Sequence, residues 1–301
     1  MESKDILDAL RRKLRKEVGF GCPVEGCGSP YLSWHHFDPP WEPKHWHNPD
    51  GLIALCLHHH KAADKGAYSI EQLRYMKAHP FLLEGGRLPG GSFPWKRKHL
   101  VVMVAGFTSV DSTVLLRIRG KDIVWLSRDT LGHQLLNLDL FDSRGTPILS
   151  MRDNDWILHA HVEDFECPPS THALLVKSDR HNTRLEVKFL QKGAPDLLSY
   201  LEKELKRSDE AIKRHRQRKW PGTRHAFDES RPGDYWKIRA QERFALIKGM
   251  ASEEPFAICR VEGHLVWPLD VTMFDTHVLL PGENLIAGAF IGGCAVAVSV
   301  G

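Results

Sequence analysis

Cysteine and histidine side chains suited to metal binding are concentrated in residues 20–66 of this 301-residue chain. Cys22 and Cys27 enclose a short turn containing Pro and Gly, which can hold two thiolates on one ion. Cys56 and His59 have the two-residue spacing of a second metal-binding knuckle. Three thiolates and one imidazole form a tetrahedral set that structural zinc favours. The spacing therefore predicts a structural Zn²⁺ site, which would supply folding energy to a segment too small to build a core.

A second group of imidazoles lies between and beside these four residues, in the pair His35-His36 and the triplet of residues 58–60. A structural zinc site that is already filled by four ligands has no need of His36 or His60. These side chains are therefore candidates for a different role. The choice of His59 as the zinc ligand rests on spacing alone, and its two neighbours in the triplet are the alternatives.

The order of these parts resembles the HNH, or ββα-metal, endonuclease family. In its common form a Cys knuckle precedes a strand ending in His-His, a loop bearing an Asn, and a Leu-Cys-x-x-Cys/His-His run that leads into a helix. Here the corresponding segments are the Cys22–Cys27 knuckle, Trp34-His35-His36, Asn48, and the run from Leu55 to Lys61. The resemblance covers residues 19–77 and extends to no part of the chain beyond them.

The resemblance implies metal-dependent hydrolysis of phosphodiester bonds. His35 and His60 would bind the catalytic metal, and His36 would be the general base that deprotonates a water. Successive side chains of a strand point to opposite faces, so adjacent histidines can take separate roles. A divalent ion with few protein ligands keeps positions open for a phosphate oxygen, and an imidazole accepts a proton near neutral pH. Mg²⁺, Mn²⁺, Ni²⁺ and Zn²⁺ all remain candidates for this ion.

Asn48 is the expected catalytic loop residue, although its position departs from the common pattern. In that pattern the Asn stands directly before the Leu-x-x-Leu-Cys run, where this chain has Gly51. Asp50 is the alternative to Asn48. The histidines at 45 and 47 are expected to line the same loop. Three tryptophans nearby either pack around the metals or stack on splayed bases: Trp34, Trp41 and Trp46.

The elements that must position these residues belong to an α+β chain with a change of pattern near residue 90. We expect an N-terminal basic helix within residues 1–18, a zinc-braced ββα-metal module at 19–83 and a Gly/Pro-rich linker at 84–99. Residues 100–301 have short alternating strands separated by turn residues, as in an antiparallel sandwich or barrel. One long, basic helix is expected within this β-rich domain, at about 196–219.

The net charge of +3 is too small to imply a nucleic-acid partner, but the basic residues are concentrated in short runs. Such runs can contact a phosphate backbone, or they can be solvated faces and, in the long helix, part of a connector. The expected contact residues are Arg11, Arg12, Lys213, Arg214, Arg216 and Arg218. The expected partner is DNA, while RNA and single strands stay open.

The composition favours a cytoplasmic protein. The sequence has neither a signal-peptide pattern nor a run of eighteen apolar residues, and six cysteines are too few for a disulfide scaffold in a chain of this length. Two functions are consistent with these patterns. One is an endonuclease of a bacterial restriction, anti-phage or mobile-element system, whose β-rich domain binds a regulatory partner or forms a homodimer. The other is a zinc-dependent nucleic-acid-binding or interaction protein without catalysis.

Overall fold

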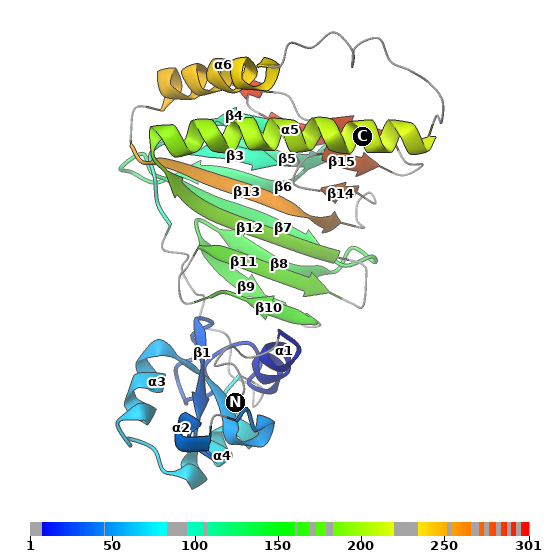
Figure 1. The fold of residues 1–301 in the computed structure, drawn as a ribbon. Coiled ribbons are helices and arrows are strands. Elements are labelled where there is room, and N and C mark those ends of the chain that lie inside the picture. The colour runs from blue at the N-terminus through cyan, green and yellow to red at the C-terminus, as the bar shows by residue number, and fades with distance from the viewer. Residues whose placement is uncertain are drawn as a thin grey trace.

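A small N-terminal module and a larger β-rich part make up the chain (Figure 1). The computed structural model describes residues 8–44, 46–82, 95–104, 107–159, 162–168, 172–178, 183–219, 234–251, 254–265, 271–273, 277–280, 284–287, 290–292 and 296–300. Helices and mainly antiparallel strands occur together, so the α+β class predicted from the sequence is confirmed.

The module is built on a two-stranded antiparallel hairpin. Its elements are α1 (Asp8–Glu17), β1 (Leu32–His36), α2 (Trp41–Lys44), the 3₁₀ turn η1 (Pro49–Gly51), β2 (Leu52–Cys56), α3 (Leu57–Asp64) and α4 (Ile70–Ala78). The whole of β2 is buried because its side chains are apolar on both faces. Ser69 and Gln72 form a reciprocal capping box that starts α4.

Helix α1 belongs to the core of the module. Leu14 and Val18 are almost fully buried and pack with Leu32, Ile53 and other residues of the hairpin. The basic residues seen in the sequence are not confined to the solvent side of this helix, since Arg15 is 5% exposed. Apolar burial on the inner side fixes α1 against β2.

Two sheets form the β-rich part. Their strands are β3 (Val101–Val104), β4 (Phe107–Val110), β5 (Val114–Ile118), β6 (Lys121–Arg128), β7 (Gln134–Phe141), β8 (Pro147–Arg152), β9 (Asp155–Leu158), β10 (Asp164–Glu166), β11 (Ala173–Ser178), β12 (Thr183–Lys192), β13 (Phe256–Leu265), β14 (Val271–Met273), β15 (His277–Leu280), β16 (Asn284–Ala287), β17 (Phe290–Gly292) and β18 (Val296–Val300). One sheet has the order β18-β5-β6-β7-β8-β9. The other runs from β10 through β13 to β16, and β3, β4 and β17 extend it beside β13.

The pairing is mainly antiparallel, and the parallel pairs join strands that are far apart in the sequence. β13 is parallel to β3, β17 to β4 and β18 to β5. A large apolar core, which includes Trp156 and Phe165, lies between the two sheets. Trp95 is also buried in this core, with its ring 5.0 Å from that of Phe189. The described end of the expected linker at 84–99 is therefore part of the sandwich, and residues 83–94 lie outside the described chain.

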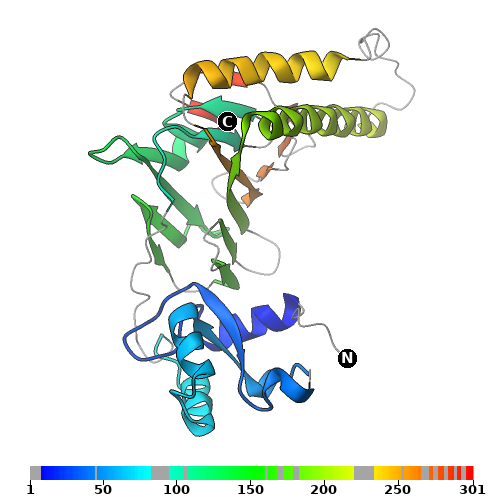
Figure 2. The same cartoon turned by 60° about the vertical axis from the view of Figure 1, so that its left-hand side comes forward.

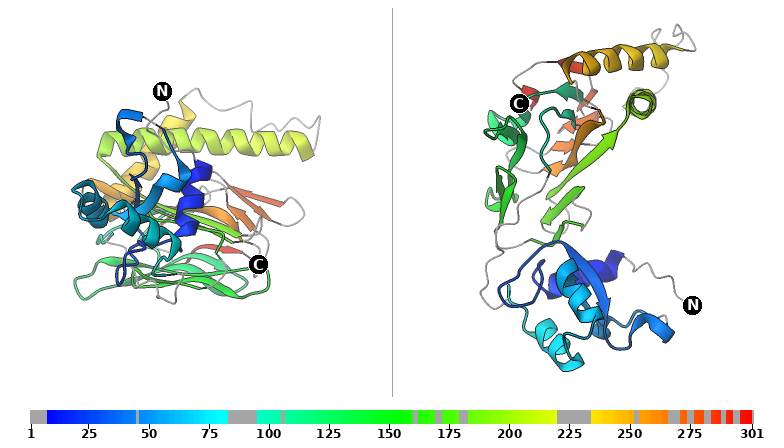
Figure 3. Two further views of the ribbon diagram at one scale, coloured as in Figure 1. Left: turned by 90° about the horizontal axis from the view of Figure 1, so that it is seen from below. Right: turned by 90° about the vertical axis from the view of Figure 1, so that its left-hand side faces the viewer.

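Two helices cover the outer face of the larger sheet (Figures 2 and 3). α5 (Ala194–Lys219) is the long helix expected at 196–219. α6 (Tyr235–Met250) is a second long helix where the sequence analysis expected only one. It shows no clear apolar stripe, because Ile238 and Leu246 are exposed while Ala240 and Ile247 are buried. Its contacts with α5 and the sheet hold it in place.

A buried ion pair joins the module to the sandwich. Arg15 of α1 donates two hydrogen bonds to Asp164 of β10, at 3.0 and 2.9 Å. The side chains of Arg15 and Asp164 are only 6% and 1% exposed. Arg12 lies 3.3 Å from the same carboxylate, and Tyr31 forms a parallel bridge with Cys167 just beyond β10. Charge pairing therefore fixes the contact between the two parts of the chain.

Within the described part of the chain, no helix combines the length and the apolar character needed to cross a membrane.

Replacing Asp164 should destabilise the protein strongly, because Arg15 would stay buried without its main partner. We expect Asp164→Ala to lower the free energy of unfolding by about 3 kcal/mol, measured by urea denaturation. Asp139→Ala is the matched control, since both oxygens of Asp139 accept hydrogen bonds from one nitrogen of the exposed Arg152. It should cost about 1 kcal/mol or less. Equal costs for the two variants would contradict a structural role for the buried pair.

Candidate metal centres

Four side chains from two distant segments converge on one point. The Nδ1 atom of His59 lies 3.3 Å from the Sγ atoms of both Cys22 and Cys56, and the Sγ atoms of Cys27 and Cys56 are 3.9 Å apart. In a tetrahedral zinc site, ligand atoms are about 3.6–3.8 Å apart. The four ligand atoms therefore have the spacing that a Zn²⁺ ion requires, and they form one of two possible metal-binding groups in the described residues.

Backbone geometry presents the first two thiols of this cluster. The turn between Cys22 and Cys27 is closed by a hydrogen bond from the Cys27 N–H to the Val24 carbonyl, at 3.0 Å. Gly26 has a φ of +73°, which a residue with a side chain rarely adopts. Cys56 ends β2 and stands directly before α3, which carries His59. The strand-to-helix junction thus supplies the other two ligands.

The thiols interact strongly with one another. A hydrogen bond from Cys22 lowers the pKa of Cys56 to about 4. That bond and burial raise the pKa of Cys22, and burial raises the pKa of Cys27. Three thiolates in one place need a cation to offset their mutual repulsion, and a soft thiolate set suits zinc. The residues present therefore fit the expected structural ion.

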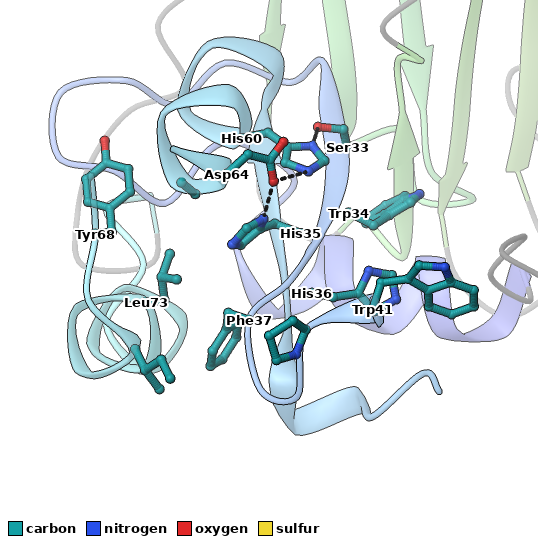
Figure 4. A pocket seen from close by; sticks show the side chains of 13 residues that line it. Ser33, Trp34, His35, His36, Phe37, Trp41, His60, Asp64, Tyr68 and Leu73 are labelled. Atoms are coloured by element: carbon teal, nitrogen blue, oxygen red, sulfur yellow. Dashed lines mark hydrogen bonds and ion pairs between the residues drawn. The ribbon is translucent and has the colours of Figure 1, made fainter. Parts of the chain in front are cut away.

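A second group contains His35 of β1 together with His60 and Asp64 of α3. The Oδ1 atom of Asp64 is 3.0 Å from the Nδ1 atom of His35 and 3.5 Å from the Nε2 atom of His60 (Figure 4). His60 and Asp64 are four residues apart on one helix and so share a face. Two imidazoles and one carboxylate form a set that holds a divalent ion and leaves coordination positions open.

Asp64 is the site residue that the sequence analysis missed. Nothing in the sequence analysis gives it a role, and its side chain is 58% exposed. Its carboxylate nevertheless points at both imidazoles (Figure 4). The signal that could have found it is its spacing of four residues from His60 along a predicted helix.

His35 is held ready to bind a cation. Its pKa is lowered mainly by burial and also by the neighbouring His60, while Asp64 acts in the opposite direction. A lowered pKa keeps the imidazole neutral at neutral pH, which is the form that binds metals. The sequence analysis assigned His59 and His60 to different ions. In the structure His59 lies with the cysteines, and His60 lies with His35.

Ser33 determines which nitrogen of His60 carries the proton. Its Oγ atom is 2.6 Å from His60 Nδ1 and 3.1 Å from the carbonyl oxygen of Leu55. The hydroxyl has one proton, and a carbonyl can only accept it. When that proton goes to Leu55, the Oγ atom accepts a hydrogen bond from the Nδ1–H group of His60. The lone pair then lies on Nε2, the atom that faces Asp64.

His36 lies on the opposite face of β1 from His35, as strand alternation predicts. Its Nε2 atom is 2.9 Å from His47 Nδ1, and its ring centroid is 5.1 Å from that of Trp41. The expected base therefore sits beside the metal-binding group without belonging to it. His45, the other histidine expected to line this loop, lies outside the described residues.

Asn48 braces the loop between the two strands. Its side-chain nitrogen donates to the Asp38 carbonyl at 2.9 Å, and its side-chain oxygen accepts from the Asp50 N–H at 3.2 Å. Gly51 explains why no Asn stands at the common position, since a Cβ atom there would lie 1.5 Å from the Asp38 oxygen. Asn48 is a positioning residue in this geometry, and Asp50 contributes its backbone to the same loop.

A cavity of about 800 Å³ adjoins both His36 and the second metal-binding group. It extends along both sides of β1 and is bordered by residues of α3 and α4 (Figure 4). Its lining residues are Ser33, Trp34, His35, His36, Phe37, Pro40, Trp41, His60, Ala63, Asp64, Tyr68, Ile70 and Leu73.

The basic residues expected to contact nucleic acid do not form one surface with this cavity. Arg11 pairs with Asp8 at 3.8 Å, and Arg12 pairs with Asp164. Lys213 pairs with Asp209 at 2.9 Å. Lys213, Arg214, Arg216 and Arg218 are all on α5, which lies at the end of the sandwich away from the module (Figures 1 and 3). The side chain of Arg216 lies outside the described residues.

Removing one thiolate should abolish the first site and unfold the module. We expect Cys56→Ala to lose about one equivalent of zinc per chain, measured by elemental analysis, together with the cooperative unfolding transition of the module. Zinc binding and folding are coupled in small metal-braced segments. Cys259→Ala is the control, because this buried thiol lies outside both groups. Full zinc content in the Cys56 variant would contradict the site.

Removing the Ser33 hydroxyl should weaken the second site alone. We expect Ser33→Ala to lower the affinity for an added divalent ion by about 10- to 100-fold, measured by titration calorimetry on the zinc-loaded protein. Ser33→Thr keeps a hydroxyl at this strand position and should restore most of that affinity. Unchanged affinity in the Ala variant would exclude the proposed control of the His60 tautomer.

Comparisons with protein-family models, curated proteins and solved structures found no match to this chain. The geometry of the two metal-binding groups and of His36 is therefore the basis for assigning a function.

Proposed function

We propose that this protein is a metal-dependent endonuclease of the HNH type, which hydrolyses phosphodiester bonds in nucleic acid, with DNA as the expected substrate. One observation carries the proposal. The first group of ligands is complete with Cys22, Cys27, Cys56 and His59, yet a second group converges beside it, with two of its three members on the helix that carries His59. A purely structural zinc module has no use for that second group or for the adjacent His36.

His35, His60 and Asp64 would hold the catalytic cation. A divalent ion bound there would stabilise negative charge on the scissile phosphate and on the leaving oxygen. The three side chains come from a strand and a helix of the same zinc-braced unit, so their positions are rigid. Ser33 orients one imidazole, and the burial of His35 orients another.

His36 would take the proton from the attacking water. In the productive tautomer its Nε2–H group donates to His47 Nδ1, which puts the lone pair on the other ring nitrogen. That Nδ1 atom accepts the water proton while the water oxygen bonds to phosphorus and the bond to the leaving oxygen breaks. His47 thus acts through His36, and Asn48 acts through the loop that carries His47.

The thiol ligands and the β-rich part of the chain support this function less directly. Three thiol ligands suit a reducing compartment such as the cytoplasm. The β-rich part is attached to the module through the buried Arg15–Asp164 pair, so it can position the nuclease relative to a bound target or partner. A role in bacterial restriction, anti-phage defence or mobile-element transfer fits a nuclease joined to such a unit.

The test is a plasmid-nicking assay on the full chain, with divalent ions removed and then added back singly. We expect cutting that depends on the added ion and falls by about 10²- to 10⁴-fold in His36→Ala. His47→Ala should lose less activity than His36→Ala and keep its affinity for the ion. His58→Ala is the matched control, because this exposed histidine belongs to neither group.

Two results of this assay would count against the proposal. Undiminished cutting by His36→Ala would exclude His36 as the base. The absence of cutting by the wild type with every ion, on plasmid and on single-stranded DNA alike, despite binding of nucleic acid, would favour the alternative of a zinc-dependent binding protein.

A further inference from the structure

We propose that the cavity binds nucleotides whose bases are unstacked, so that the substrate is single-stranded or unpaired nucleic acid. This inference rests on the proposed nuclease function and specifies its substrate class. It comes from the chemistry of the cavity walls, which the metal-binding groups alone do not explain.

The cavity is aromatic and apolar on both sides of the metal-binding group. Trp34 and Trp41 lie on the side of His36, and Tyr68 lies on the side of His35, where Phe37 is almost fully buried (Figure 4). Side-chain alternation along β1 produces this division, because consecutive residues of the strand face opposite ways. A phosphate held between His36 and the cation would therefore have aromatic rings toward both of its neighbouring nucleotides.

Cations are missing from the same walls. Among the described residues that line the cavity there is no Lys and no Arg, and Asp64 adds a negative charge. Lys61, Lys65 and Arg74 are exposed in the module but do not line the cavity, and Arg74 pairs with Asp38. The basic group on α5 lies at the far end of the molecule (Figure 1).

These walls suit a single strand better than a duplex. A duplex presents phosphates outward and is held mainly by Lys and Arg. Its bases are stacked inside and reach a protein ring only when the duplex is opened. A single strand offers the face of each base to an aromatic ring at no such cost. The cavity supplies the rings on which unstacked bases can lie, and it lacks the Lys and Arg side chains that hold a duplex through its phosphates.

A neighbouring ring holds Trp41 in a position suited to stacking on a base. Its ring centroid lies 4.8 Å from that of His47, with an angle of 30° between the ring planes. The ring is therefore backed by an imidazole and held in one orientation, so binding a base restricts it little further. Its side chain is partly buried, as expected for a ring that both packs and contacts a ligand.

The experiment measures binding apart from cutting. Full-length His36→Ala protein, loaded with zinc but without a second divalent ion, is titrated into a labelled 12-nucleotide single strand and into a duplex of the same sequence. We expect the single strand to bind at least tenfold more tightly. Its affinity should depend only weakly on salt, because few counterions are released.

Variants of the tryptophans test the walls directly. Trp41→Ala in the same background should weaken single-strand binding by about five- to a hundredfold, the range for loss of one stacked base, and Trp41→Phe should restore part of it. Trp46→Ala is the matched control, because this ring is 50% exposed and does not line the cavity. Thermal unfolding of each variant separates lost binding from lost folding.

The outcomes test the proposed substrate class separately from the proposed nuclease function. Duplex binding that equals or exceeds single-strand binding, or a Trp41→Ala variant that binds like the Trp46→Ala control, overturns the substrate class. If the wild type still nicks plasmids after such a result, the proposed nuclease function stands and the proposed single-stranded substrate is rejected. Conversely, ring-dependent single-strand binding by a chain that cuts nothing supports the cavity assignment and rejects the hydrolase.

Discussion

The convergence of Cys22, Cys27, Cys56 and His59 is the constraint on which the N-terminal module depends. The module has one small apolar core, centred on β2, and its two ligand pairs come from segments about thirty residues apart. A bound structural zinc contributes an apparent free energy of about 10–16 kcal/mol at neutral pH, which is comparable with the whole stability of a small domain. One such ion would therefore fix the junction of β2 and α3 against the knuckle.

The second metal-binding group follows from that fixed junction. Once α3 is anchored through His59, the next residue His60 faces β1, and Asp64 follows it one turn later on the same face. Strand alternation brings His35 to this group and turns His36 away from it. Adjacent residues thus obtain different environments from local geometry alone, and Ser33 and Asn48 refine them through hydrogen bonds.

Local spacing explains what could be predicted from the sequence. The cysteine knuckles, the strand alternation at His35-His36 and helix α5 depend on residues close together in the chain, and the structure has them where expected. The pairing of Arg15 with Asp164 joins residues 149 positions apart and leaves no local pattern. The parallel strand pairs likewise join distant segments, and tertiary contacts rather than periodicity place α6.

The central claim is that two different metal ions bind side by side on α3. Anomalous scattering from crystals grown with zinc and then soaked in Mn²⁺ would test it most directly, because the two elements are distinguished by their absorption edges. We predict a zinc peak among Cys22, Cys27, Cys56 and His59, and a manganese peak among His35, His60 and Asp64. A zinc peak alone, with those three side chains paired as they are now and manganese bound elsewhere or nowhere, would contradict the account.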